Sequence, residues 1–249
     1  MKIALIGYGA MGKLIERQAK EKGHEIAVVV SDADAGLSAT ELGEKLKGID
    51  VAIDFSAAEA VSRNVGACVA AGVPLVEGTT GWNDSMAEIE RIVSDGNGSF
   101  VFGANFSIGV NLFYRIADLA AELFAKFPEY EAFIEEQHHS RKKDAPSGTA
   151  LKLQDIVTEQ MKKGRTPPSP QAAIADEGVR VPVSSTRAGN IPGTHRVGFD
   201  GPADQVFLEH LARSREGFAA GALLTAEWIV GKKGFYEFAD VMDEVLSKT

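Results

Sequence analysis

The sequence is poor in the residues that crosslink small proteins or bind metals. It contains a single cysteine, Cys68, which excludes an internal disulfide and any cysteine-clustered zinc or iron–sulfur site. No H-E-x-x-H or comparable ligand spacing is present, so we expect no metal site. Cys68 itself is expected to be a small buried hydrophobic residue.

Long apolar runs are also absent. No stretch approaches the roughly 20 apolar residues that a transmembrane helix requires. The N-terminal run Met1–Gly7 is too short for a signal peptide and passes directly into a glycine-rich turn, so we interpret it as a first strand. With 45% hydrophobic and 24% charged residues, the composition predicts an ordinary globular protein of the cytoplasm.

Positive charge is in deficit, because 26 lysines and arginines face 35 acidic residues and the formal net charge is −9. This balance argues against nucleic acid or an anionic membrane as the main partner. One segment is an exception, since it gathers His138, His139, Arg141, Lys142 and Lys143. Such a run is often only a solvated loop, but on an acidic chain it also suggests a pocket for a small anion.

The first part of the chain alternates short β-branched runs with amphipathic ones, a pattern typical of βαβ units. The predicted strands are Lys2–Ile6, Glu25–Val30, Asp50–Phe55, Val73–Glu77 and Ser99–Phe102, and the predicted helices are Met11–Lys22, Ala57–Ala71 and Asn83–Val93. This order predicts an α/β fold with a Rossmann-type, doubly wound parallel sheet. Gly23 and Gly72 are expected to end the first two helices.

The alternation of short strands with helices ends at about residue 105. The pattern of the following residues predicts a second, α+β domain with a mixed or antiparallel sheet. Its expected helices are Gly109–Phe127 and Gly148–Lys163. Its expected strands are Glu131–Gln137, Val181–Arg187, Thr194–Asp200 and Gln205–Ala212. The proline-containing stretch Gly164–Asp176 is expected to be a surface loop. We expect the three later strands to be antiparallel. Helices at Phe218–Val230 and Tyr236–Leu246 would return to the first sheet, giving one domain of residues 1–105 plus 216–249 and another of residues 106–215.

A glycine-rich turn follows the first predicted strand. Gly7-Tyr8-Gly9-Ala10-Met11-Gly12 matches G-x-G-x-x-G and leads into a helix. In this motif the first glycine permits a tight turn, the second lets the backbone approach a pyrophosphate, and the third allows close packing of helix on strand. The helix N-terminus favours the bound anion. A purely structural turn is the alternative, but Asp32 ends the second strand about 20 residues further on, where a ribose hydroxyl would bind, and the combination predicts dinucleotide binding.

Asp32 also bears on which dinucleotide is bound. Its charge would repel a 2′-phosphate and no arginine lies beside it in the sequence, so NADH is favoured over NADPH. The carboxyl ends of parallel strands face the cofactor in such folds. The further candidate contacts are therefore Phe55 after the third strand, Gly78, Thr79 and Thr80 after the fourth, and Ala104, Asn105 and Phe106 after the fifth.

The basic segment combines proton donors with a helix N-terminus. His138 and Lys142 could supply protons, and Ser147-Gly148-Thr149 opens a predicted helix. Glycine is unfavourable in a helix, but it leaves N–H groups open to a carboxylate. The histidines could instead be a satisfied strand end and Ser-Gly-Thr a simple cap. Together they predict a site that binds an anion and donates a proton.

This segment resembles the signature of the 4-hydroxy-tetrahydrodipicolinate reductase (dihydrodipicolinate reductase) family. The matching residues are His138-His139-x-x-Lys142-x-Asp144-Ala145-Pro146-Ser147-Gly148-Thr149-Ala150, and in the same order Asp54-Phe55-Ser56, Gly78-Thr79-Thr80-Gly81, Ala104-Asn105-Phe106-Ser107-x-Gly109-Val110-Asn111, Arg187-Ala188-Gly189 and Gly193-Thr194-His195. The resemblance therefore extends over nearly the whole chain. Two positions depart from it, because Ala10 replaces an arginine that many members carry and Ala57 stands in a stretch that commonly includes a proline.

The resemblance implies an enzyme that reduces 4-hydroxy-tetrahydrodipicolinate to tetrahydrodipicolinate with NAD(P)H, in the diaminopimelate route of lysine biosynthesis. It implies that His138 and Lys142 are the acid–base residues. It further implies that the substrate carboxylates are held by His139, Lys142, Ser147, Gly148 and Thr149, with Arg215 a further candidate. A homotetramer assembled through the sheet of the second domain is implied as well.

Other classes of protein fit the sequence less well. An aspartate or homoserine dehydrogenase could share the first domain, but not the motif around His138. Residues 140–143 fit S-x-x-K of acyl-enzyme hydrolases, yet the accompanying S-D-N and K-T-G motifs are missing. A nucleotide-sensing regulator without catalysis would have no need to keep both His138 and Lys142.

Overall fold

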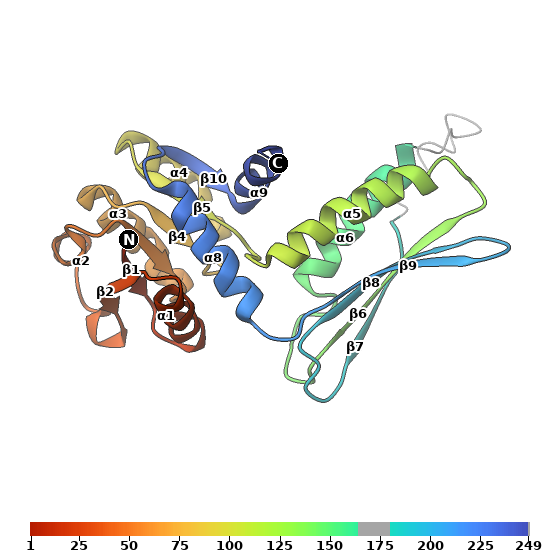
Figure 1. Cartoon of the computed structure of the whole chain (residues 1–249), viewed down its shortest axis with the longest axis horizontal. Coiled ribbons are helices and arrows are strands. Elements are labelled where there is room, and N and C mark those ends of the chain that lie inside the picture. Colours follow the sequence, from red (N-terminus) through yellow and green to blue (C-terminus); the bar gives the residue numbers. More distant parts are fainter. Residues whose placement is uncertain (164–179, 249) are drawn as a thin grey trace. The chain divides into compact units, whose positions relative to one another are not determined.

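The computed structural model describes residues 1–163 and 180–248, and the chain divides into two compact units (Figure 1). Unit 1 comprises Met1–Ile108 and Arg215–Thr249, and unit 2 comprises Gly109–Ser214. The loop expected at Gly164–Asp176 lies outside the described residues. Among the helices that the structure describes, none has both the length and the apolar character needed to cross a membrane.

Unit 1 is built on a six-stranded sheet with the strand order β10-β5-β4-β3-β1-β2, in which every pair is parallel. Its strands are β1 (Lys2–Ile6), β2 (Glu25–Val30), β3 (Val51–Asp54), β4 (Leu75–Glu77), β5 (Ser99–Phe102) and β10 (Gly234–Glu237). Strands β3 and β4 are buried along their whole length, because helices cover the sheet on both faces. The predicted doubly wound parallel sheet is confirmed.

The helices of unit 1 are α1 (Ala10–Glu21), α2 (Ala39–Leu46), α3 (Val61–Ala71), α4 (Met86–Asp95), α8 (Glu216–Ile229) and α9 (Phe238–Ser247), with short 3₁₀ helices at Asp32–Asp34, Ala58–Ala60 and Asn83–Ser85. Residues of α2, α3 and α4 form one apolar layer with the sheet, in which Cys68 is buried as expected. Gly72 adopts the left-handed conformation as the C-cap of α3, and Gly23 adopts it just after α1.

Two elements of unit 1 differ from the sequence prediction. Helix α2 was not expected, although its capping box is visible in the sequence: the Ser38 hydroxyl accepts from the Glu41 N–H, and the Glu41 carboxylate accepts from the Ser38 N–H. The helix expected from Tyr236 is wrong at its start. Residues 234–237 instead pair with β5 as an edge strand, and α9 begins at Phe238.

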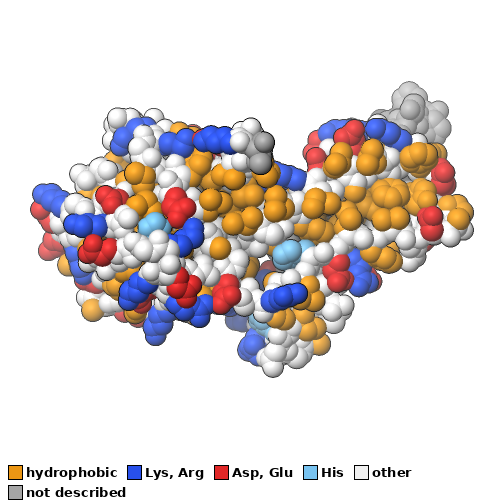
Figure 2. All heavy atoms as spheres, viewed as in Figure 1, with side chains coloured by type: hydrophobic (Ala, Val, Ile, Leu, Met, Phe, Trp, Pro, Cys, Tyr) orange, Lys and Arg blue, Asp and Glu red, His pale blue; other side chains and the backbone are white. Residues whose placement is uncertain are grey.

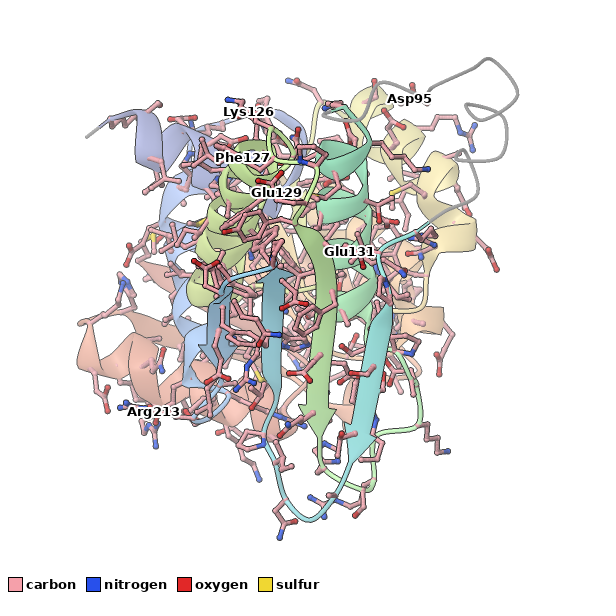
Figure 3. The ribbon with its side chains drawn as sticks, turned by 90° about the vertical axis from the view of Figure 1, so that its right-hand side faces the viewer. Asp95, Lys126, Phe127, Glu129, Glu131 and Arg213 are labelled. Atoms are coloured by element: carbon pink, nitrogen blue, oxygen red, sulfur yellow. The ribbon has the colours of Figure 1, made fainter. Side chains whose placement is uncertain are left out.

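Unit 2 is a four-stranded sheet with the order β7-β6-β8-β9, covered on one face by two helices. Its strands are β6 (Glu131–His138), β7 (Val183–Arg187), β8 (Thr194–Asp200) and β9 (Gln205–Leu211), and its helices are α5 (Ile108–Phe124) and α6 (Gly148–Lys163). Side chains of both helices pack on Ile134, Val197 and Phe199 of the sheet. In Figure 3 the opposite face of this sheet is turned to the viewer, and no described element covers it.

A mixed or an antiparallel sheet was expected in unit 2, and the observed sheet is mixed. The segment Val181–Arg187 was expected to be antiparallel, but the strand begins at Val183 and runs parallel to β6. The physical reason is the crossover through α6, which returns the chain to the end of the sheet from which β6 started. Strands β8 and β9 are antiparallel, as expected.

Candidate active site

Two glycines of the first turn are required by the chain itself. Gly7 has a φ of +85°, and a Cβ there would lie 2.4 Å from the carbonyl oxygen of Phe55. A Cβ on Gly12 would lie 2.4 Å from the carbonyl oxygen of Gly7. Neither position can hold a side chain, because the end of β3 and the start of α1 approach the turn too closely.

Gly9 is different, because nothing in the chain requires a glycine there. Its φ is −79°, and a Cβ at this position would meet no atom within 4 Å. It caps α1, whose first turn includes Ala10 and Met11 and carries no acidic residue. Open space beside exposed helix N–H groups suits a pyrophosphate, and a dinucleotide fits this turn. Tyr8 lies alongside, with its hydroxyl donating to the Glu16 carboxylate.

The segment after β2 carries the acid expected to bind ribose. Asp32 is exposed, and its side chain has no partner among the described residues. Asp34, in contrast, accepts from the Ser31 N–H and is paired with Lys45 at 2.7 Å. Arg63 of α3 reaches the segment that follows Asp32 and donates to the carbonyl oxygen of Ala35 at 2.7 Å.

The other candidate cofactor residues follow the carboxyl ends of β3, β4 and β5, at one edge of the parallel sheet. They are Phe55, Gly78, Thr79, Thr80, Ala104, Asn105 and Phe106. Phe106 is only 1% exposed, with its ring centroid 4.8 Å from that of Phe238, so it belongs to the core of unit 1. The ring of Phe55 lies against Gly78, where a Cβ would come within 2.2 Å of it.

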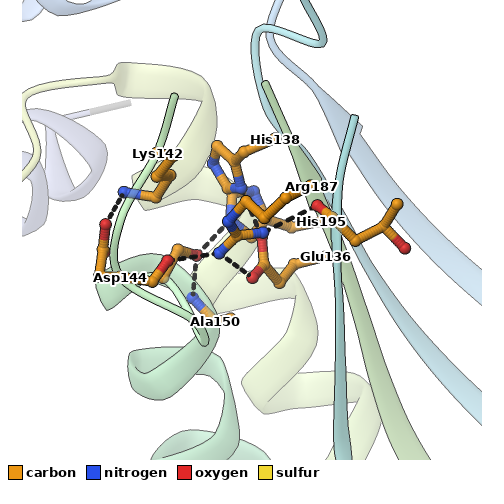
Figure 4. A network of polar contacts seen from close by, with 9 residues as sticks. Glu136, His138, Lys142, Asp144, Ala150, Arg187 and His195 are labelled. Atoms are coloured by element: carbon orange, nitrogen blue, oxygen red, sulfur yellow. Dashed lines mark hydrogen bonds and ion pairs between the residues drawn. The ribbon is translucent and has the colours of Figure 1, made fainter. Parts of the chain in front are cut away.

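In unit 2, a buried cluster of acid and base forms at one end of the sheet (Figure 4). Glu136 and His138 lie on the same face of β6, since side chains alternate along a strand. The strand register places Glu136 opposite His195 and His138 opposite Arg187. Glu136, His138 and His195 are each at most 9% exposed, so water does little to screen the interactions among them.

Glu136 is the charged centre of the cluster. Burial alone would raise its pKa, but hydrogen bonds from Arg187, Ser185 and His138 outweigh that effect and lower the pKa to about 2. Arg187 Nη2 lies 2.6 Å from Glu136 Oε1, and His138 Nδ1 binds Oε2. An ionised carboxylate can only accept, so Nδ1 of His138 carries the hydrogen and Nε2 is the nitrogen that can exchange a proton.

The surroundings of His138 favour this exchange. A Cβ on Gly193 would lie 3.1 Å from His138 Nε2, so the glycine leaves this atom uncrowded. Burial lowers the pKa of His138, with Glu136 opposing, and burial together with His138 lowers the pKa of His195 to about 4. Both imidazoles are therefore neutral near neutral pH. Nδ1 of His195 and Nδ1 of His139 are buried without a hydrogen-bond partner among the described residues.

The N-terminus of α6 borders this cluster. Ser147 Oγ accepts from the Ala150 N–H at 3.2 Å and lies 3.1 Å from His195 Nε2. Gly148 is exposed, and a Cβ there would meet no atom within 4 Å, as at Gly9. Thr149, the next residue, interacts with Tyr114. The first turn of α6 has no acidic residue, so the geometry suits an anion.

Lys142 lies in the loop between β6 and α6. Its ammonium nitrogen is 2.8 Å from Asp144 Oδ1, and Arg187 donates to the carbonyl oxygen of Asp144. Arg141 is bonded to Asn190. Unit 2 thus brings together His138, His139, Lys142 and residues 147–149. Arg215 is an exposed residue of unit 1 at the start of α8.

Glu136, His138 and His195 also offer three potential metal ligands within 4.8 Å of one another. No ligand spacing of this kind is visible in the sequence, because His195 is contributed by another strand. The guanidinium of Arg187 already neutralises Glu136, and Lys142 adds a second positive charge to the loop, so the cluster suits an anion better than a metal ion.

Sequence reasoning did not assign a role to Glu136, Arg187 or His195. The alternation along β6 places Glu136 beside His138 and was available as a signal. Arg187 and His195 were visible only as matches to family motifs, because their place beside His138 depends on strand pairing across about 50 residues of chain.

A doubly wound sheet with a glycine-rich turn at a helix N-terminus, joined in one chain to a buried acid–base cluster, defines a dinucleotide-dependent oxidoreductase. Family models described as dihydrodipicolinate reductase, N-terminus and C-terminus, match residues 1–106 and 109–242. The chain belongs to the dihydrodipicolinate reductase family.

Individual relatives agree with this assignment. The chain is 37% identical to a 4-hydroxy-tetrahydrodipicolinate reductase of Christiangramia forsetii, over 98% of this chain and 99% of that one. It is 41% identical to the enzyme of the same name from Methanosarcina barkeri, over 78% and 73%. Among solved structures, a dipicolinate-bound dihydrodipicolinate reductase from Paenisporosarcina sp. TG-14 has a TM-score of 0.73 at 24% identity, covering 96% and 99%. An amine dehydrogenase from Mycobacterium smegmatis shares the fold, with a TM-score of 0.56 at 10% identity, covering 96% and 95%.

The pairing of Glu136 with His138 predicts a measurable shift. In a Glu136→Gln variant the carboxylate that opposes the effect of burial is lost, so the pKa of His138 should fall below its wild-type value. An NMR titration of the histidine ring signals measures this. The ring signals of His24, which is paired with Glu227 in unit 1, should not be changed by the substitution and serve as the control. An unchanged His138 curve would contradict the pairing.

Proposed function

We propose that this chain catalyses the NAD(P)H-dependent reduction of 4-hydroxy-tetrahydrodipicolinate to tetrahydrodipicolinate, as a cytoplasmic enzyme of the diaminopimelate route to lysine. The observation that carries the proposal is the His138 cluster at the N-terminus of α6, in a chain of this family. In this proposal residues 1–105 plus 216–249 bind the dinucleotide, and residues 106–215 bind the substrate.

The substrate is a dicarboxylate, and unit 2 offers groups suited to it. The open N-terminus of α6 at Gly148 can receive one carboxylate. The unpartnered Nδ1 atoms of His139 and His195 and the ammonium of Lys142 are further polar groups for a bound anion. The solved relative was described with dipicolinate bound, which is also a dicarboxylate.

Bound at the turn Gly7–Gly12, the dinucleotide would supply a hydride to the substrate ring. The ring then gains negative charge, which a proton from Lys142 Nζ or from His138 Nε2 neutralises. Because the neutral His138 ring carries its hydrogen on Nδ1, Nε2 can donate only after it has taken up a proton from solvent. Glu136 holds the His138 ring through Nδ1 so that Nε2 is presented. Arg187 and Lys142 lower the electrostatic cost of the developing charge, because both are fixed before the reaction by Glu136 and Asp144.

The assignment of the proton donors can be tested by single substitutions. His138→Ala and Lys142→Ala should each lower kcat, by about 10²–10⁴-fold for the residue that donates, while leaving NADH affinity near wild type. The assay follows NADH absorbance with substrate made in situ from pyruvate and aspartate semialdehyde by the preceding synthase. Lys143→Ala, an exposed neighbour, is the matched control and should keep normal turnover. Normal turnover in both test variants would contradict the assignment.

We also propose that NADH is preferred to NADPH. The exposed carboxylate of Asp32 is free to bind ribose hydroxyls and would repel a 2′-phosphate, and the guanidinium of Arg63 is already bonded to the carbonyl oxygens of Ala35 and Leu37 and to Asn64. Ala10 offers no charge to a phosphate.

Removing the charge of Asp32 should therefore change the preference. Asp32→Ser is expected to lower the ratio of kcat/KM for NADH to that for NADPH by about tenfold or more, since a repulsion of like charges is relieved. Steady-state kinetics with both cofactors measure the ratio. Asp84→Asn, on the exposed surface before α4, controls for the change in net charge. An unaltered ratio would show that the selectivity arises elsewhere.

The uncovered face of the unit 2 sheet supports the proposal of a homotetramer. Phe133 and Phe207 meet edge to face across Gly198, with ring centroids 5.8 Å apart. Phe207 is 43% exposed and Leu211 is 55% exposed, on a sheet face that no described element covers. Exposed aromatic and aliphatic side chains on an uncovered sheet face are typical of an interface between chains.

A second apolar surface allows a comparison. Hydrophobic side chains gather along α5 (Figure 2), where Leu119 is 58% exposed. A charge buried in an interface is costly, so Phe207→Asp should dissociate the tetramer, whereas Leu119→Asp should leave it intact. Sedimentation velocity measures the oligomeric state of each. The opposite pattern would place the interface on the helices instead of the sheet.

A further inference from the structure

Two carboxyl groups outside the proposed mechanism lie side by side beneath the candidate cofactor site. Asp54 ends β3 and Glu77 ends β4, and the parallel register pairs the two residues directly. Both are completely buried. Two ionised carboxylates in this position would repel each other strongly, because little water is present to screen them.

The hydrogen bonds around the pair are unequal. Asp54 accepts from the Ser56 N–H at 2.8 Å on one oxygen and from Asn64 Nδ2 at 2.6 Å on the other. Glu77 Oε1 accepts from the Thr79 N–H at 2.7 Å, but Glu77 Oε2 is buried without any donor. A bare carboxylate oxygen in the interior is costly, whereas a protonated one becomes a donor and can use the carboxylate beside it as acceptor.

The electrostatics agree with this distribution. Burial raises the pKa of Glu77 well above its ordinary value of 4.5, and the charge of Asp54 raises it further. Burial also raises the pKa of Asp54, but hydrogen bonds from Ser56, Asn64 and Glu77 act against it. Of the two groups, Glu77 is therefore the one that keeps a proton.

The neighbouring elements supply little to offset a second negative charge. From α3, Cys68 is a buried thiol whose own pKa is raised, and Arg63 reaches the pair only through Asn64. The helix α8 packs against β3 and β4, and its buried residues are uncharged. No described cation thus contacts either carboxyl group directly, which leaves a proton as the counter-charge.

The pair connects the two turns that carry candidate cofactor contacts. Thr79 donates its N–H to Glu77, and its Oγ1 accepts from the Ser56 N–H at 3.1 Å, while Ser56 also donates to Asp54. The carbonyl oxygen of Thr79 accepts from Trp82 Nε1 at 2.7 Å. The position of Thr79 therefore depends on both carboxyl groups.

We propose that Glu77 holds a proton that it donates to Asp54, and that this shared proton fixes the turns at Ser56 and Thr79 relative to each other. Glu77 is then a positioning residue for the dinucleotide, a role that rests on the proposed function. Loss of the proton at high pH would place two negative charges under the cofactor turns and weaken dinucleotide binding.

The proton itself is tested without any activity. A group that keeps its proton in the fold but loses it on unfolding destabilises the fold as pH rises above the ordinary carboxyl value of 4.5. Relative to a Glu77→Gln variant, which mimics the protonated acid, the unfolding equilibrium constant of the wild-type chain should rise by about tenfold per pH unit until the group ionises in the fold. Denaturant titrations at several pH values measure this ratio, and Glu90→Gln, on the exposed side of α4, is the matched control.

The positioning role is tested by NADH affinity, measured by fluorescence titration from about pH 6 to about pH 9. Glu77→Gln should bind NADH as the wild type does at the lower pH and lose less affinity at the higher one. Glu77→Ala should bind about tenfold more weakly throughout, because it lacks both the donor and the acceptor.

Each outcome decides a separate point. A ratio of unfolding constants that does not change with pH would show that Glu77 is ionised in the fold and would overturn the proposal. A pH-dependent ratio with normal NADH affinity in Glu77→Ala would establish the proton and overturn the positioning role. Failure of the wild-type chain to bind NADH at any pH would overturn the positioning role and the proposed function together, and the unfolding data would still decide on the proton.

Discussion

A carboxyl group that is taken out of water must either be paired with cations and donors or keep its proton, and the active regions of both units depend on how this constraint is met. In unit 2, Glu136 is ionised because Arg187 and His138 bind its two oxygens. That charge fixes which nitrogen of His138 can exchange a proton. In unit 1 no cation contacts Asp54 or Glu77 among the described residues. In our proposal a proton on Glu77 therefore removes one of the two negative charges.

The glycines near the two helix N-termini show how packing and binding can be told apart. At Gly7 and Gly12 a side chain would collide with backbone atoms of the chain, so folding alone explains the residue. At Gly9 and Gly148 a side chain would meet nothing, and at Gly148, the first residue of α6, glycine also weakens the helix. A glycine that packing does not require is explained by what occupies the space in front of it. Both positions stand where a helix presents N–H groups to an anion.

Much of the fold follows from the sequence because it depends on local patterns. The βαβ rhythm of unit 1 and the glycine turn predicted the parallel sheet, and the alternation along β6 predicted that strand. The missed elements were short or depended on tertiary contacts: α2 has only eight residues, and β10 forms because an edge of the sheet is available to residues that also fit a helix. The direction of β7 depended on the path of the chain through α6.

The chemistry of the candidate site could be predicted from the sequence, but the contacts between its residues could not. His138, Lys142 and Ser147–Thr149 lie close together in the sequence, so their residue types were enough to suggest a site for an anion and a proton. Arg187 and His195 come from strands that only the register places beside them, and the Asp54–Glu77 pair joins two strands in the same way. Long-range strand pairing brings charges together that no local pattern reveals.

The fold by itself would not have identified the reaction, since proteins of other activities share it at about 10% identity. The unit 2 cluster restricts the class of substrate. The doubly wound sheet alone does not, because it binds dinucleotides in enzymes that reduce or oxidise many different substrates. A buried imidazole with one nitrogen held by an ionised carboxylate, next to a helix N-terminus without acidic residues, favours an acceptor that is anionic and must be protonated. The dicarboxylate substrate that we propose meets both requirements, and a substrate without acceptor oxygens would leave the buried Nδ1 atoms of His139 and His195 without a partner.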